Sequence, residues 1–229
     1  MIYTDQTRLA MKICFQAHQH QTDKSGVPYV FHPIHLAEQM QTEETVLAAL
    51  LHDVIEDTPY TPERLEQEGI PSEVSRALTL LTHDKNEPYL EYVCRIGCNS
   101  IAKAVKIADL THNSDLTRMV QITDTDRLRV RKYRTAKTLL QNIHPVENHY
   151  ETFYPISSSV MLFISATEQR VLSCGIQTES WRYTLSMESV YRLNDLIGDS
   201  QTSFTENLEQ FCKNHTISEL ETFIRTVVC

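Results

Sequence analysis

The sequence predicts a mainly α-helical fold, with an all-helical domain over residues 1–144 and a small α+β domain over residues 145–229. Apolar residues recur at helical spacing through the first part of the chain, and capping residues stand at the ends of these patterns. Short β-branched runs replace the helical pattern only after Pro145. With 41% apolar and 22% charged residues, the composition is that of an ordinary globular protein.

Four apolar patterns predict amphipathic helices in the first domain. They are Leu9, Ile13 and Ala17; Leu47, Leu50, Leu51, Val54 and Ile55; Val74, Ala77, Leu78 and Leu81; and Ile101, Val105, Ala108 and His112. Capping and stop residues place the helix boundaries. These are Pro59 after the run that ends at Asp57, Thr61 before Pro62, Gly69, and Ser100 before Ile101.

The second domain is expected to contain a hairpin and two helices. Residues 160–165 and 171–176 are short β-branched runs separated by four polar residues, which is typical of a hairpin, and residues 181–185 could supply a third strand. Helical patterns return at 187–197 and 219–228. The sequence indicates no role for this accessory domain.

Several classes of protein are excluded by length and charge patterning. The longest apolar run, residues 46–51, is far shorter than the ~18 residues of a membrane span. The N-terminal residues contain no signal-peptide pattern, so a soluble, cytoplasmic protein with reduced cysteines is expected. A net charge of −9 argues against nucleic-acid binding. The oligomeric state is not indicated.

One basic segment stands out from this acidic background. Residues 118–137 contain seven basic residues and two acids. A concentrated basic segment in an acidic protein suits a small polyanionic ligand better than a long polymer. A solvated helix face explains the same pattern about equally well.

Three segments carry side chains of the metal-binding type. On one continuous helix, His52, Asp53 and Glu56 would share a face opposite the leucines. Asp109 stands where an apolar run breaks, and would be a metal ligand, an ion-pair partner or a surface residue. His32 precedes Pro33 and could equally cap the following helix. Together, two imidazoles and two carboxylates form a donor set suited to Mn²⁺, Fe²⁺ or Zn²⁺.

Five sequence blocks, in this order, resemble the HD-superfamily hydrolase domain of the Rel/SpoT type, and in particular the small stand-alone alarmone hydrolases. The blocks are Ala17-His18, KSGVPY at 24–29, HPI at 32–34, ALLHDVIEDT at 49–58, and VKIAD at 105–109 with His112 and Asn113. The resemblance covers roughly residues 4 to 140. A chance match of all five blocks is not credible.

The resemblance implies a catalytic centre with one metal ion. Its four ligands, usually to Mn²⁺ in this family, match His32, His52, Asp53 and Asp109. The acidic pair that orients and deprotonates the attacking water matches Glu56 and Asp57.

The resemblance also implies substrate contacts. Lys24 and Ser25 match residues that line the nucleotide pocket, Asn113 a residue at the ribose and base, and Tyr133 one beside the sugar and phosphates. Basic neighbours of Tyr133 could hold the 5′ phosphates, and Lys85 is a further candidate; these neighbours are Arg129, Lys132, Arg134 and Lys137. One departure stands at Asp23, where the family usually has an Arg that stacks on guanine. An acidic side chain cannot make that contact.

The function implied is metal-dependent removal of pyrophosphate from the 3′ position of guanosine tetra- or pentaphosphate, (p)ppGpp, the alarmone of the stringent response, giving GDP or GTP. One alternative is the same chemistry on another 3′- or 2′-phosphorylated nucleotide, such as NADPH. A second alternative is a non-catalytic regulatory module that binds a nucleotide or a partner. In the first two readings the partner is a small-molecule nucleotide.

Overall fold

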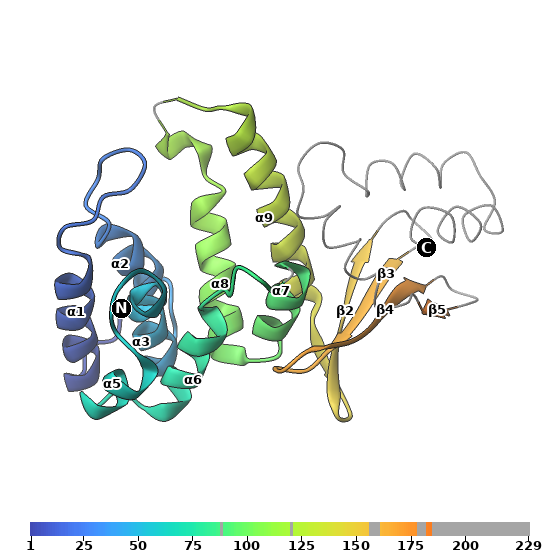
Figure 1. Ribbon diagram of the computed structural model, residues 1–229, viewed down its shortest axis with the longest axis horizontal. Coiled ribbons are helices and arrows are strands. Elements are labelled where there is room, and N and C mark those ends of the chain that lie inside the picture. Colours follow the sequence, from blue (N-terminus) through green and yellow to red (C-terminus); the bar gives the residue numbers. More distant parts are fainter. Residues whose placement is uncertain (88, 120, 156–160, 178–181, 185–229) are drawn as a thin grey trace. The chain divides into compact units, whose positions relative to one another are not determined.

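The computed structural model describes residues 1–87, 89–119, 121–155, 161–177 and 182–184 (Figure 1). It separates into two compact units. The first comprises residues 1–84 and 99–123, and the second comprises residues 85–98 and those from 124 onward. Among the described helices, none combines the length and the apolar character that crossing a membrane requires.

The first unit is built from helices around a central buried one. In chain order its helices are α1 (Asp5–His18), α2 (Phe31–Glu38), α3 (Glu43–Leu51), α4 (Val54–Asp57), α5 (Pro62–Gln67), α6 (Ser72–Leu81), α8 (Ser100–Asn113) and the 3₁₀ turn η1 (Leu116–Arg118). Helix α3 packs against α1, α2, α6 and α8, and its residues 46–51 are fully buried. The predicted helical class is confirmed, and α1, α6 and α8 coincide with predicted apolar patterns.

The helix starts follow side-chain capping. Thr61 accepts a hydrogen bond from the backbone N–H of Arg64, as its place before Pro62 predicts. The cap expected at Ser100 is wrong by one residue. Asn99 is the N-cap, because its Oδ1 accepts hydrogen bonds from the N–H groups of Ile101 (3.1 Å) and Ala102 (3.0 Å).

The continuous helix expected across residues 47–55 is also wrong. The chain forms α3 and α4 with a turn at His52 and Asp53 between them. In a continuous helix the carbonyl of Ala49 would accept the backbone N–H of Asp53. Here that carbonyl accepts a hydrogen bond from Nδ1 of His52 at 2.9 Å, so a side chain competes for the acceptor. The orientations of these two residues are therefore set by the turn rather than by helical rotation.

Gly69, after α5, has a backbone conformation that strains other residues. Its φ is +106°, while the nearest heavy atom to an added Cβ, on Leu9, would be 3.6 Å away. We expect Gly69→Ala to lower the free energy of unfolding by about 1–3 kcal/mol through backbone strain, as measured by urea denaturation. Glu68→Ala, next to it at φ −79°, is the matched control and should change stability by less than about 0.5 kcal/mol. Equal losses in both variants would contradict this explanation.

The second unit combines two helices with a sheet. Its elements are α7 (Tyr89–Gly97), α9 (Asp124–Asn142), β1 (His144–Val146), β2 (His149–Pro155), β3 (Met161–Ala166), β4 (Val171–Gln177) and β5 (Arg182–Thr184). The strands form an antiparallel meander in the order β1 to β5, of which β2 to β5 are labelled in Figure 1. Helix α9 packs against β2 and α7, and Gly97 lets α7 approach Ile143 closely, since an added Cβ would be 2.7 Å from its Cδ1.

The strand predictions for this unit are confirmed where the structure describes them. The predicted hairpin is β3 and β4, and β5 lies within the expected third strand. Strands β1 and β2 and helix α7 were not predicted, because their apolar patterns are short and interrupted by polar residues. The helices expected at 187–197 and 219–228 lie outside the described residues.

The change from helix to strand falls between α9 and β1, close to the expected domain boundary at residue 144. Packing divides the chain differently, because α7 and α9 belong to the same compact unit as the sheet. The assignment of residues 1–144 to a catalytic domain and residues 145–229 to an accessory domain stays a prediction.

Candidate metal centre

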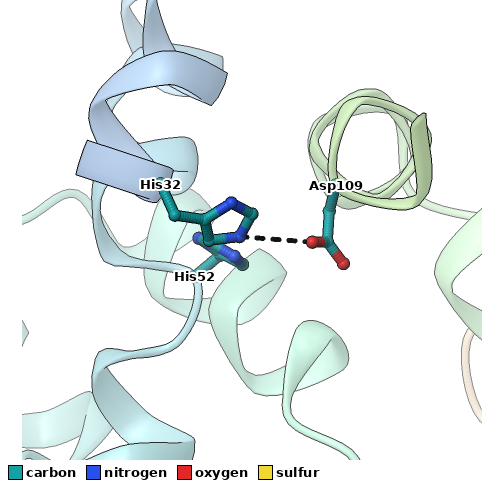
Figure 2. A group of neighbouring side chains, drawn as sticks. All are labelled: His32, His52 and Asp109. Carbon is teal, nitrogen blue, oxygen red and sulfur yellow. Dashed lines mark ion pairs between the residues drawn. The ribbon is translucent and has the colours of Figure 1, made fainter. Parts of the chain in front are cut away.

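Three buried side chains from three helical segments meet in the first unit. His32 lies in the first turn of α2, His52 follows the last residue of α3, and Asp109 lies on α8. One potential ligand atom from each lies within 4.8 Å of the others. Figure 2 shows the two imidazole rings next to one another, with the Asp109 carboxylate pointing toward them. This group could hold a metal ion.

The fourth predicted ligand lies beside this group. Oδ2 of Asp53 is 2.9 Å from Nε2 of His52 and 3.9 Å from Nε2 of His32. Its side chain is 21% exposed, whereas that of Asp109 is 8% exposed. The structure therefore brings all four predicted ligands together and leaves the Asp53 side more open to solvent.

Hydrogen bonding turns His52 into a suitable ligand. Because a carbonyl oxygen only accepts, Nδ1 of His52 carries the proton that it donates to Ala49. Burial opposes the charged ring, but the Asp53 carboxylate, 2.9 Å from the buried Nε2, raises the His52 pKa to about 9, so this nitrogen offers its lone pair to an ion once its proton has left. Metal-bound imidazoles in proteins use this arrangement, with one nitrogen anchored to a carbonyl and the other on the ion. The residues present thus fit a metal ion.

A second chain of contacts orients His32. Nη1 of Arg118 lies 3.2 Å from Nδ1 of His112, and since arginine only donates, that nitrogen is an acceptor. The 2.7 Å contact between Nδ1 of His32 and Nδ1 of His112 is then donated by His32. In the neutral ring, Nε2 of His32, which lies 3.3 Å from Oδ1 of Asp109, would then present its lone pair to a bound ion, whereas in the charged ring it donates to that carboxylate. Burial, together with the charges of His32 and Arg118, lowers the pKa of His112 to about 4, so a neutral acceptor is consistent with its surroundings.

The electrostatics of the group favour anionic carboxylates. Burial alone would raise the pKa of Asp109, but the Lys106 ammonium at 3.0 Å and the His32 hydrogen bond hold it well below its usual range. Burial likewise opposes ionisation of Asp53, yet His52 lowers the Asp53 pKa to about 2. Both carboxylates are therefore ionised at neutral pH, the state that binds cations.

Tyr29 holds Asp53 in place. Its hydroxyl donates a hydrogen bond to Oδ2 of Asp53, and partners of ligating carboxylates commonly change metal affinity by ten- to a hundredfold. We expect Tyr29→Phe to weaken Mn²⁺ binding about tenfold, as measured by competition with a chromophoric chelator. Tyr60→Phe, which removes a hydroxyl from a ring stacked under Arg64, is the control and should leave the affinity unchanged. An unchanged Kd in both variants would contradict the role of Tyr29.

The two predicted catalytic acids lie on the short helix α4, immediately after the turn that carries His52 and Asp53. Both side chains are exposed. Oε2 of Glu56 accepts a hydrogen bond from the backbone N–H of His83 at 3.4 Å. Burial and the charge of Asp53 raise the pKa of Asp57, which places it within electrostatic reach of the metal group. Their catalytic roles stay predictions.

A cavity of about 370 Å³ adjoins the metal group, a volume within the range of small-molecule sites. Its lining includes His32, Tyr29 and His112 on the side of the metal group, and Ser25 among the predicted pocket residues. The other lining residues are Asp23, Val27, Pro28, Phe31, His35 and Arg118.

The remaining predicted substrate contacts divide between the two units. In the first unit, Lys24 is exposed, and the Asn113 amide donates to Oδ1 of Asp109 at 2.5 Å. In the second unit, Lys85 is exposed, and Tyr133 stacks near Arg129, whose guanidinium also pairs with Asp126 at 3.1 Å. Lys137, on α9 in the same unit, is partly exposed. The substrate roles of all these residues stay predictions.

No sequence pattern predicts the contacts of three neighbours of the metal group, which are Tyr29, His112 and Arg118. Tyr29 and His112 lie inside the sequence motifs. A tyrosine three residues before His32, or a further histidine on the same helix as Asp109, does not indicate which residue it contacts. Arg118 is the first residue of the basic segment, and that pattern predicts no individual partner for it. Its ion pair with Asp23, with Nη2 3.5 Å from Oδ2, joins residues 95 positions apart, and no local pattern predicts such a pair.

Comparison with known proteins supports the resemblance. The bifunctional (p)ppGpp synthase/hydrolase SpoT of Escherichia coli is 38% identical over 120 residues, which are 46% of this chain and 17% of that protein. The guanosine-3′,5′-bis(diphosphate) 3′-pyrophosphohydrolase of Danio rerio is 38% identical over 112 residues, 44% of this chain and 62% of that protein. The SpoT/Rel-type (p)ppGpp hydrolases are homologues of this chain.

The fold of these hydrolases is also shared. A solved metazoan orthologue of SpoT that hydrolyses ppGpp superposes with a TM-score of 0.51 at 24% identity, over 60% of this chain and 86% of that one. The likeness concerns the fold. The chain spans 17% of the length of the E. coli homologue and 62% of the Danio rerio homologue. No family model matches the chain.

Proposed function

We propose that this chain is a metal-dependent hydrolase that removes pyrophosphate from the 3′ position of guanosine tetra- or pentaphosphate, giving GDP or GTP. The observation that carries the proposal is the buried group of two imidazoles and one carboxylate beside a cavity large enough for a nucleotide part. Homology to (p)ppGpp hydrolases supports the substrate class.

His32, His52, Asp53 and Asp109 would hold one divalent ion, for which we propose Mn²⁺ because the donor set mixes nitrogen and oxygen. When bound, such an ion supplies Lewis acidity and lowers the pKa of water. The protein contributes the orientation of the ligands. Ala49 and His112 each accept a hydrogen bond from Nδ1 of one ligand imidazole, so Nε2 would carry the lone pair of each neutral ring.

Glu56 and Asp57 would orient the attacking water and accept its proton. Burial and the charge of Asp53 raise the pKa of Asp57, which brings it closer to the neutral range in which a general base works best. Asn113 would contact the ribose and base. Lys24 and Ser25 would line the nucleotide pocket. The phosphate contacts of Lys85, Arg129 and Lys137 and the place of Tyr133 beside the sugar stay predictions.

A panel assay tests the proposed substrate. Purified protein of residues 1–229 with Mn²⁺ is given ppGpp, pppGpp, NADPH and a 3′-phosphorylated adenosine nucleotide, and the released pyrophosphate and orthophosphate are measured separately. We expect pyrophosphate from ppGpp and pppGpp. Omitting Mn²⁺ and adding a chelator should remove turnover. Tight binding of ppGpp without turnover would favour a regulatory module instead.

The second substrate class is kept because of Asp23, the residue that departs from the family pattern at the base-binding position. Orthophosphate released from NADPH, with no pyrophosphate from ppGpp, would favour hydrolysis of another phosphorylated nucleotide.

We also propose a cytoplasmic location, which is consistent with the free, buried thiols of Cys14, Cys94, Cys98 and Cys174.

A further inference from the structure

The cavity beside the metal group has walls of mixed character. Aromatic and apolar side chains form part of them, and some of these are well exposed: Phe31 is 59% and Val27 45% exposed. Two large exposed apolar side chains at the lining of one cavity provide a surface on which a flat apolar ligand face can lie. The base of a nucleotide has such faces.

Arg118 brings a guanidinium to the same cavity. Nη1 donates to the carbonyl oxygen of His112 at 3.2 Å, and Nη2 pairs with Oδ2 of Asp23 at 3.5 Å. The terminal nitrogens are thereby engaged at the edge of the guanidinium plane. Its faces, on a side chain that is 33% exposed, remain available for stacking on an aromatic ring.

Asp23 is built into the loop that carries it. Its Oδ1 accepts hydrogen bonds from the backbone N–H groups of Ser25 (2.8 Å) and Val27 (3.0 Å). The Ser25 hydroxyl in turn donates to the carbonyl oxygen of Arg118 at 3.2 Å. The loop and the segment after α8 are thus tied together at the cavity by two separate contacts, which hold the guanidinium in one place.

Charge decides between a base and a phosphate as the group that Arg118 contacts. The arginine is the one cation of the lining that is charged at all pH values of interest, and the Asp23 carboxylate balances it. Phosphate sites usually present an uncompensated excess of cations. A compensated guanidinium with a free face favours a neutral, planar group.

Building on the proposed function, we propose that Arg118 stacks on the nucleobase of the substrate and that Asp23 is the positioning residue that holds it there. The guanidinium then comes from the segment after α8 and not from the 24–29 loop. Because stacking requires the plane and the charge together, lysine cannot replace it.

Binding of guanosine, GMP and GDP to residues 1–229, measured by titration calorimetry, tests this assignment. None of the three carries a 3′ phosphate, so binding is measured without turnover. We expect Arg118→Ala and Arg118→Lys each to lower the affinity for all three probes by about the same factor of ten, a size typical of cation–π contacts. Asp23→Asn keeps the acceptor for the loop and should weaken binding by a smaller factor. Arg64→Ala, an exposed ion-paired arginine of the same unit, is the control.

Several results would overturn the assignment. One is a loss of affinity in the Arg118 variants that grows with the number of 5′ phosphates on the probe. The others are wild-type affinity in Arg118→Lys or in Arg118→Ala, and a wild-type protein that binds none of the probes. Loss of Mn²⁺ from Arg118→Ala would assign the residue to orientation of His32 instead. The proposed function is judged separately by pyrophosphate release from ppGpp. If the wild type binds GDP through Arg118 but releases no pyrophosphate from ppGpp, only the proposed function is contradicted. If Arg118→Ala hydrolyses ppGpp with an unchanged KM, only this inference is contradicted.

Discussion

Replacing Asp53 by alanine is expected to abolish metal retention and turnover together. Its carboxylate lies 2.9 Å from Nε2 of His52 and contributes one of the two negative charges of the donor set, the other being that of Asp109. The substitution removes one of four ligands and half of the negative charge of the donor set, so it should lower metal affinity by more than a hundredfold. Residues that only hydrogen-bond to a ligand change the affinity by ten- to a hundredfold. Metal per chain after gel filtration, measured by mass spectrometry, and the rate with ppGpp are the two readouts.

Two further variants make this result interpretable. Asp53→Asn keeps the shape of the side chain and should lose the metal as well, which separates the loss of charge from a loss of packing. Asp5→Ala removes a fully exposed carboxylate that pairs with Arg8 on α1, and should keep both metal and activity. Added Mn²⁺ at a hundred times its Kd should stabilise the wild type by about 2.7 kcal/mol and leave Asp53→Ala unchanged. Stoichiometric metal in Asp53→Ala would refute the ligand assignment.

Glu56→Gln and Asp57→Asn are expected to lower kcat by about a hundredfold to ten-thousandfold while the metal is retained. A positioned proton acceptor contributes an effect of this size. Both residues lie on α4, outside the group of potential ligand atoms, so their removal leaves the donor set intact. The rate with saturating ppGpp and the metal content of the same preparation are measured side by side.

The control for the acidic pair is Glu63→Gln, an exposed acid in the first turn of the next helix, α5, which should retain full activity. A larger fall in Asp57→Asn than in Glu56→Gln would identify Asp57 as the proton acceptor, in line with its raised pKa. Metal loss equal to that of Asp53→Ala in either variant would move that residue from the catalytic pair to the ligand set.

Much of the local structure could be predicted because it depends on neighbouring residues. Apolar residues at a spacing of three to four lead one helix face into the core, as in α1, α6 and α8, and Thr61 before Pro62 caps α5 through its own hydroxyl. The short β-branched runs of β3 and β4 and the polar turn between them similarly predict a hairpin. Each of these signals is complete within about fifteen residues.

The break at His52 shows where such reasoning ends. Apolar periodicity continues from Leu47 to Ile55, so the pattern predicts one helix, yet the side chain of His52 competes for the Ala49 carbonyl where the helix ends. The competing bond depends on the rotamer of one buried imidazole. An apolar pattern is a property of many residues together, so it carries no information about the rotamer of one side chain.

The residue types along the chain define which chemistry is available: two imidazoles and two carboxylates, next to an acidic pair, in a chain homologous to the (p)ppGpp hydrolases. The tertiary structure decided how they are used. Packing of α2, α3 and α8 brings His32, His52 and Asp109 within reach of one another, and it places Tyr29 on Asp53 and Arg118 on Asp23. These contacts join residues that are distant in the chain, and their geometry follows from which helix faces are buried against one another, a property of the packed core and not of any local stretch of sequence.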